Sequence, residues 1–165
     1  MFVLGIDPGL TTTGYGAVRK GNGSPEAVAV GVIRTDKDLP VAQRLLELHR
    51  DLEGVLSDLD PDVVALEQVF VNRNLATATN VGRASGIVLL AAASAGLEVV
   101  EYSPTAVKAT VTGYGAAGKH QVQDMVARRL RLAVAPTPAD AADALAVALC
   151  HIQNPAKRVS TGAAT

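Results

Sequence analysis

The order of strand-like and helix-like segments is the feature that most limits how this chain can fold. Three apolar runs typical of strands come first, separated by a Pro8-Gly9 turn and by a glycine-rich loop at residues 21–25. A stripe of apolar residues at a helical period follows, and then strands and helices alternate. Strands are predicted at residues 3–7, 13–19, 26–35, 63–66 and 97–102, and helices at 41–59, 74–95, 104–110, 119–131 and 138–153. The order βββαβαβ followed by helices predicts an α/β fold with a mixed five-stranded sheet flanked by helices.

The size of the chain indicates one domain. Its 165 residues, 48% of them apolar, suffice for one sizeable core and not for two. We expect residues 1–153 to form the domain and the small, polar residues 154–165 to be a disordered tail. The longest apolar run, residues 87–93, is too short to cross a membrane, and the N-terminus does not resemble a signal peptide. With a single cysteine, Cys150, the chain is expected in the cytoplasm.

Charge is divided unevenly along the sequence. Residues 1–102 hold eight Lys and Arg against 13 Asp and Glu, whereas residues 103–165 hold seven against three. The basic candidates in the second part are Lys108, Lys119, Arg128, Arg129 and Arg131. This pattern suits a protein that binds a polyanion with one face, although a merely solvated surface explains the uneven charge equally well.

Two carboxylates stand at the ends of predicted strands. Asp7 closes the first strand and Glu67 closes the fourth, and ligands of α/β sheets bind outside the carboxyl ends of the strands. If these strands are neighbours, the two acids face the same space and repel each other unless a cation joins them. The alternative is that Asp7 caps the Asp-Pro-Gly turn and Glu67 is a surface residue.

A second pair of acids lies in the last helix. Asp140 and Asp143 are three residues apart and therefore share one helix face. Asp140 also fits a helix start with Thr137 as N-cap, but Asp143 lies beyond the first turn among small apolar residues. Four carboxylates without a Cys or His cluster suit Mg²⁺ or Mn²⁺, and such sites hydrolyse phosphodiesters with two ions.

These residues belong to motifs that resemble a known family. The segments are GIDPGLTTTGYG, LEQVFVNRN, YSPTAVKATVTGYGAAGKHQV and ADAADALAVALCH, and they cover residues 5–151 in the family's order. They resemble the RuvC Holliday junction resolvases, which are crossover junction endodeoxyribonucleases of the ribonuclease H-like superfamily. The resemblance implies a ribonuclease H-like fold and a metal-dependent endonuclease that resolves four-way DNA junctions in recombination and repair.

The resemblance also assigns roles to residues. Asp7, Glu67, Asp140 and Asp143 would be the catalytic acids and would hold Mg²⁺ or Mn²⁺, two ions per site. Lys108 and Lys119 would contact DNA near the cut, and Phe70 would stack at the junction, while Arg73 is a weaker candidate for a phosphate contact. Paired nicks in a symmetric junction imply a homodimer. The small residues of the 74–95 helix, Ala78, Gly82, Ser85, Gly86 and Ala93, are the candidate dimer surface. The family also implies a branch-migration motor complex as partner.

Three other functions share features with this sequence. A sugar kinase or actin-like ATPase has a similar loop after its first strand, but it needs a second domain for which 165 residues leave no room. A non-catalytic junction-binding protein would be expected to lack one or more of the acids. A ribonuclease H-like nuclease that acts on RNA or another branched nucleic acid stays open on the sequence.

Overall fold

The computed structural model describes residues 1–69 and 75–154. The predictions for Phe70, Arg73 and the tail from residue 155 therefore lie outside the described residues. The strands are β1 (Phe2–Asp7), β2 (Thr12–Arg19), β3 (Glu26–Arg34), β4 (Val63–Glu67) and β5 (Val99–Tyr102). The helices are α1 (Val41–Leu59), α2 (Leu75–Ser94), α3 (Pro104–Thr112), α4 (Lys119–Arg129) and α5 (Ala139–Gln153).

The five strands form one mixed sheet in the order β3-β2-β1-β4-β5. β1 pairs antiparallel with β2 and parallel with β4, and β5 extends the parallel half. The crossover from β3 back to β4 places the fourth strand beside the first, as the βββαβ order allows. The predicted mixed five-stranded sheet with flanking helices is confirmed.

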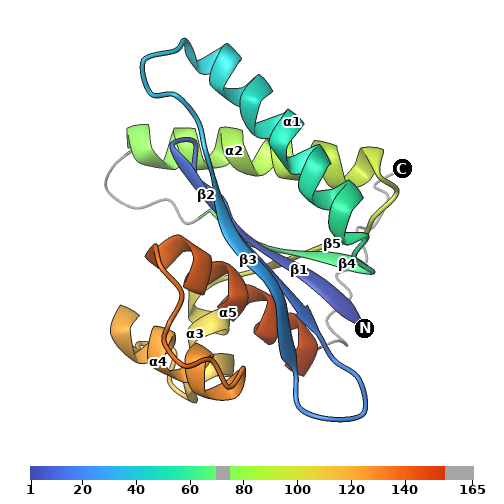
Figure 1. Ribbon diagram of the computed structural model, residues 1–165. Helices are drawn as coiled ribbons and strands as arrows, with labels where there is room; N and C mark the ends of the chain where they lie inside the picture. The colour runs from blue at the N-terminus through green and yellow to red at the C-terminus, as the bar shows by residue number, and fades with distance from the viewer. Residues whose placement is uncertain (70–74, 155–165) are drawn as a thin grey trace, which may run out of the picture.

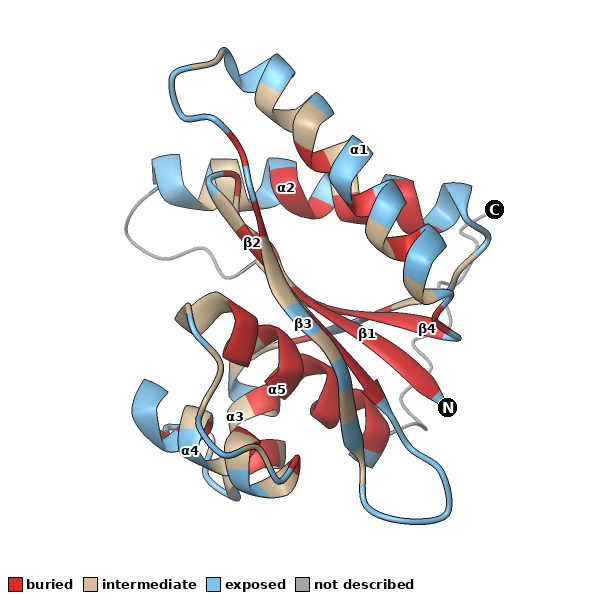
Figure 2. Cartoon of the chain, in the orientation of Figure 1, coloured by how far each residue is buried: buried red, intermediate tan, exposed pale blue. Residues whose placement is uncertain are grey.

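Helices cover both faces of this sheet, as Figure 1 shows. α1 and α2 lie on one face, and α3, α4 and α5 lie on the other. Each face has its own apolar core, one centred on Leu4, Leu48 and Leu66 and the other on Val3, Val126 and Leu149. α5 is buried along most of its length (Figure 2), because α3 and α4 cover the side that does not touch the sheet.

Glycines in β1 and β2 let α5 lie directly on the sheet. A Cβ atom at Gly14 would collide with the Asp140 carbonyl, and one at Gly5 would collide with the Ala144 carbonyl. At Gly16 a Cβ would lie 2.7 Å from the Leu145 side chain. Only glycine permits so close an approach of helix to strand. These contacts place the first turns of α5 beside the end of β1.

The other end of α5 is held by a buried polar contact. Tyr102 Oη, at the end of β5, lies 2.9 Å from His151 Nδ1 in a hydrogen bond. Burial lowers the pKa of His151 below its ordinary value. The neutral imidazole therefore pairs with the tyrosine and fixes α5 against the parallel half of the sheet.

Four helices differ from the predicted bounds by one or two residues, since α2 ends at Ser94, α3 ends at Thr112, α4 ends at Arg129 and α5 begins at Ala139. α4 ends at Arg129 and not at residue 131, because the backbone of Arg131 is left-handed with φ of 55° and turns the chain away from the helix. α5 begins at Ala139, and Pro138 precedes it with no side-chain capping bond, so the cap expected from Thr137 is absent. Asp140 remains in the first turn of α5, where a negative charge interacts favourably with the helix dipole.

α2 is long and apolar enough to cross a membrane, although no such segment is predicted from the apolar runs of the sequence. By length and composition it is one helix, within the described ranges, that could cross a membrane. Helices that pack in a protein core meet the same criteria. One face of α2, with Ala84, Val88 and Ala92, packs in the core that it shares with α1 and the sheet, while Leu89 and Leu90 on another face are exposed.

Candidate active site

The pairing of β1 with β4 brings the two strand-end acids together. Ile6 is opposite Leu66 in the parallel register, so Asp7 and Glu67 are the next residues of adjacent strands. A hydrogen bond joins the carboxyl groups of Asp7 and Glu67. The sequence predicted this juxtaposition on the condition that the strands were neighbours, and that condition is met.

α5 brings the second pair of acids to the same place. Asp140 lies against Gly14, the residue that pairs with Asp7 across β1 and β2. The charges of Asp143 and Asp140 both act on Asp7. Four carboxylates from three distant parts of the chain therefore gather where β1 and β4 end.

Burial and mutual repulsion change the acidity of this cluster. Burial is the largest cause that raises the pKa of Asp7, and the negative charges of Glu67, Asp143 and Asp140 raise it further, to about 8. Burial and the charge of Asp143 also raise the pKa of Glu67, against the lowering effects of the Asp7 hydrogen bond and of Lys108 and Lys119. With all four acids ionised, the cluster would therefore carry more negative charge than its own surroundings neutralise.

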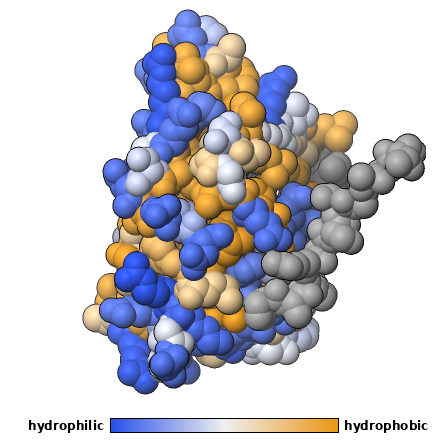
Figure 3. Space-filling view, turned by 90° about the vertical axis from the view of Figure 1, so that its right-hand side faces the viewer, coloured by the Kyte–Doolittle hydropathy of each residue, from blue (hydrophilic) through white to orange (hydrophobic). Residues whose placement is uncertain are grey.

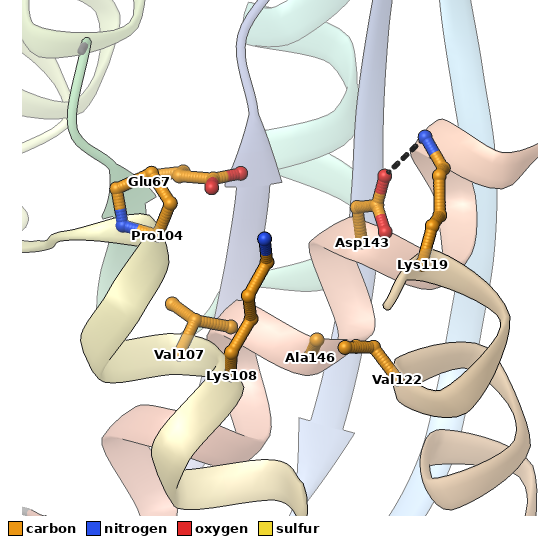
Figure 4. A pocket seen from close by; sticks show the side chains of 8 residues that line it. All are labelled: Glu67, Pro104, Val107, Lys108, Lys119, Val122, Asp143 and Ala146. Carbon is orange, nitrogen blue, oxygen red and sulfur yellow. Dashed lines mark ion pairs between the residues drawn. The ribbon is translucent and has the colours of Figure 1, made fainter. Parts of the chain in front are cut away.

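Two lysines face these acids across a cavity of about 220 Å³. The cavity is lined by Glu67, Pro104, Val107, Lys108, Lys119, Val122, Asp143 and Ala146 (Figure 4). Lys108 comes from α3 and Lys119 from the first residue of α4, and Lys119 Nζ lies 2.9 Å from Asp143 Oδ2. The structure therefore brings both predicted lysines to the carboxylates.

Other basic candidates lie elsewhere. Arg128 and Arg129 are in the last turn of α4, the end of that helix opposite Lys119. Arg131 donates a hydrogen bond of 3.1 Å to Ser24 Oγ in the hairpin loop. These three arginines are not part of the cavity.

Sequence reasoning missed the apolar part of the cavity. Pro104, Val107 and Val122 form its walls on α3 and α4, and Ala146 lies one turn after Asp143 on α5. Only Ala146 carried a signal, because it shares the helix face of Asp143. The valines could not be distinguished in the sequence from ordinary core residues.

The donor chemistry of the cluster fits hard divalent cations. All four candidate ligands are carboxylates, which suits Mg²⁺ or Mn²⁺ and not the nitrogen and sulfur preferences of Zn²⁺. As the side chains stand, no three acidic, histidine or cysteine residues in the described ranges converge on one ion position. Asp143 is bonded instead to the ammonium group of Lys119.

Sequence comparisons identify proteins that are similar to this chain. Residues 3–151 match the family model described as crossover junction endodeoxyribonuclease RuvC. One relative, the crossover junction endodeoxyribonuclease RuvC of Syntrophomonas wolfei, is 49% identical over 154 residues, which cover 93% of this chain and 90% of that protein.

Solved structures with the same architecture include a RuvC of Thermus thermophilus in complex with a Holliday junction substrate. It is 40% identical, with a TM-score of 0.86, over 92% of this chain and 93% of that chain. A yeast mitochondrial Holliday junction resolvase, 14% identical with a TM-score of 0.63 over 90% of this chain and 77% of that chain, shares the fold.

Proposed function

The chain belongs to the RuvC family of crossover junction endodeoxyribonucleases, and we propose that Asp7, Glu67, Asp140 and Asp143 are its catalytic residues. The observation that carries this assignment is the cluster itself, in which burial and three neighbouring acids raise the pKa of Asp7 to about 8. Such a concentration of negative charge is costly to fold and is expected where a cation is to be bound. The ribonuclease H-like domain of residues 1–153 forms this cluster because α5 packs directly on β1 and β2.

The family's metal dependence is met here by oxygen ligands. The four carboxylates would hold two Mg²⁺ or Mn²⁺ ions. Bound at this position, the ions would activate a water molecule and neutralise charge on the phosphate that is cut. Glu67 and Asp7 fix one side of the site through the sheet, while α5 fixes the other.

Lys108 and Lys119 are proposed to contact DNA phosphates beside the cut. Lys108→Ala is expected to weaken junction binding and to reduce the slope of log K against log salt by about one unit, because one phosphate contact is lost. Arg128→Ala is the control, since Arg128 is an exposed residue at the far end of α4. Equal slopes for the wild type and Lys108→Ala, measured by fluorescence anisotropy, would remove Lys108 from the DNA contacts.

Phe70 is proposed to stack at the junction, as the family resemblance implies, and Arg73 is proposed to contact a phosphate. Phe70→Ala is expected to reduce the preference for a junction over a duplex and to leave the thermal midpoint unchanged. Loss of base stacking costs about 1–3 kcal/mol of binding, whereas removal of a core phenylalanine costs about 3–5 kcal/mol of stability. A large fall in midpoint with unaltered junction preference would make Phe70 a packing residue.

A homodimer is proposed through α2. The exposed residues Gly82, Gly86, Leu89, Leu90 and Ala93 follow one another at helical spacing. A Cβ at Gly82 or Gly86 would meet nothing within 4 Å, so a second helix has room to approach closely. Ala78 is half-buried and Ser85 is buried, so these two do not lie on the exposed stripe. Figure 3 shows apolar surface on the side toward which the C-terminal end of α2 points.

Leu90→Glu is expected to produce monomers, because Leu90 is 54% exposed in the single chain and a glutamate would be buried without a partner in the dimer. Sedimentation velocity of the wild type and the variant measures this. Leu46→Glu, on α1 and 47% exposed, is the matched control and should leave the mass unchanged. An unchanged dimer in Leu90→Glu would place the interface elsewhere.

The remaining partners follow from the family. We propose that the enzyme acts in the cytoplasm, in recombination and repair, with a branch-migration motor complex beside it on the junction. Each subunit of the dimer would cut one of two symmetric strands.

A cleavage assay on three substrates tests the proposed function. A four-way DNA junction, a DNA duplex of the same sequence and an RNA:DNA hybrid are incubated with the enzyme and Mg²⁺ or Mn²⁺. Paired cuts in the junction alone are expected. Preferential cutting of the hybrid would favour a nuclease acting on RNA, and junction binding without cutting would favour a non-catalytic protein.

A further inference from the structure

Lys119 forms an ion pair inside the carboxylate cluster. Its Nζ atom lies 2.9 Å from Asp143 Oδ2, and Figure 4 shows the two side chains pointing at each other from α4 and α5. The side chain of Asp143 is 23% exposed, whereas that of Lys119 is 56% exposed. The aspartate is thus held in the site while the lysine stands at its open edge.

The positive charge of Lys119 reaches all four acids. The hydrogen bond to Asp143 and the charges of Asp143, Asp140 and Asp7 raise its pKa, and its own charge lowers that of Glu67. Lys108 lines the same cavity and acts on Glu67, but among the ion pairs of the described residues only Lys119 is bonded to one of the four acids. Lys119 is therefore placed where a cation is needed.

An ammonium group and a divalent cation compete for the same carboxylate oxygen. With Lys119 on Asp143, no three of the acids in the described ranges converge on one ion position. A lysine on a flexible, exposed stem can leave if it finds another anion, and a DNA phosphate is such an anion.

We propose that Lys119 fills the cation position at Asp143 in the DNA-free enzyme and moves to a DNA phosphate when a junction binds. The inference rests on the proposed function, since it takes the four acids as the metal site. Departure of Lys119 frees Asp143, so junction binding and metal binding strengthen each other by the same factor. The enzyme then binds its full number of metal ions only when DNA is bound.

Metal titration of the DNA-free enzyme tests this inference. Mn²⁺ is titrated into the full chain by calorimetry at fixed ionic strength. Lys119→Met, which keeps a long unbranched side chain and removes its charge, is expected to bind Mn²⁺ at least about fivefold more tightly than the wild type, the lower end of typical coupling between sites. Lys119→Arg keeps the ion pair and should resemble the wild type. Thermal midpoints confirm that each variant is folded.

Lys108→Met is the matched control. It removes one positive charge from the same cavity without removing the bond to Asp143, so its gain in Mn²⁺ affinity should be clearly smaller. Equal gains for Lys108→Met and Lys119→Met, or no gain for Lys119→Met, would overturn the inference while the wild type still bound Mn²⁺. If neither the wild type nor any variant bound Mn²⁺, the proposed function itself would fail.

Discussion

Asp7→Asn is expected to reduce junction cleavage by at least about a hundredfold while junction affinity stays near that of the wild type. A metal ion contributes several kcal/mol to stabilising a phosphodiester transition state, and each 1.36 kcal/mol is a factor of ten in rate. The same result is expected for Glu67→Gln, Asp140→Asn and Asp143→Asn, because each acid is assigned to metal and not to DNA.

Single-turnover cleavage and anisotropy on the same junction measure the two effects separately. Asp124→Asn is the control, because Asp124 is an exposed acid on α4 that does not line the active-site cavity. A variant of any of the four acids that cleaved at a near-normal rate at saturating metal would exclude that residue from the site.

The same Asp7→Asn substitution is expected to stabilise the metal-free fold at pH 8. The pKa of Asp7 rises from 3.8 to about 8 on folding, so between these values the folded chain holds a proton that the unfolded chain has lost. Stability from this group is therefore greatest at low pH and falls as pH rises toward 8. An effect on the order of 2 kcal/mol raises the thermal midpoint by about 4–8 °C in a chain of this size.

Thermal unfolding in EDTA at pH 5, 7 and 8.5 measures this difference. The wild type should lose more stability than Asp7→Asn as pH rises, and Mn²⁺ at pH 8.5 should stabilise the wild type more than the variant. Equal losses of stability in the two proteins would mean that folding does not raise the pKa of Asp7. Together the two results would show one residue that costs stability and provides activity.

Most of the fold could be predicted from the sequence because its signals are local. Apolar runs closed by turns gave the strands, and the helical period of residues 41–59 gave α1 with the observed bounds. The helix ends were harder. Nothing in the neighbouring sequence predicts the left-handed backbone of Arg131 or the start of α5 at Ala139.

The proximity of the four acids could be predicted, but their surroundings could not. Asp7 and Glu67 were identified from strand ends, and Asp143 from an acid set among alanines. The ion pair between Lys119 and Asp143 joins residues that lie 24 positions apart on two helices, and neither residue type nor spacing predicts it. The sequence contains the glycines of β1 and β2, but it does not show that they allow α5 to pack directly on these strands.

The dependence of the cluster on α5 has a consequence for how the enzyme is made. Asp7 and Glu67 are synthesised early, but Asp140 and Asp143 belong to the last helix, which is also the buried centre of one core. A nascent or truncated chain that stops before residue 139 has half of the carboxylates and an uncovered glycine surface on β1 and β2. With the proposed catalytic acids, such a fragment would lack two of the four carboxylates and part of one core, so cleavage activity is expected only after α5 has been synthesised and has packed on the sheet.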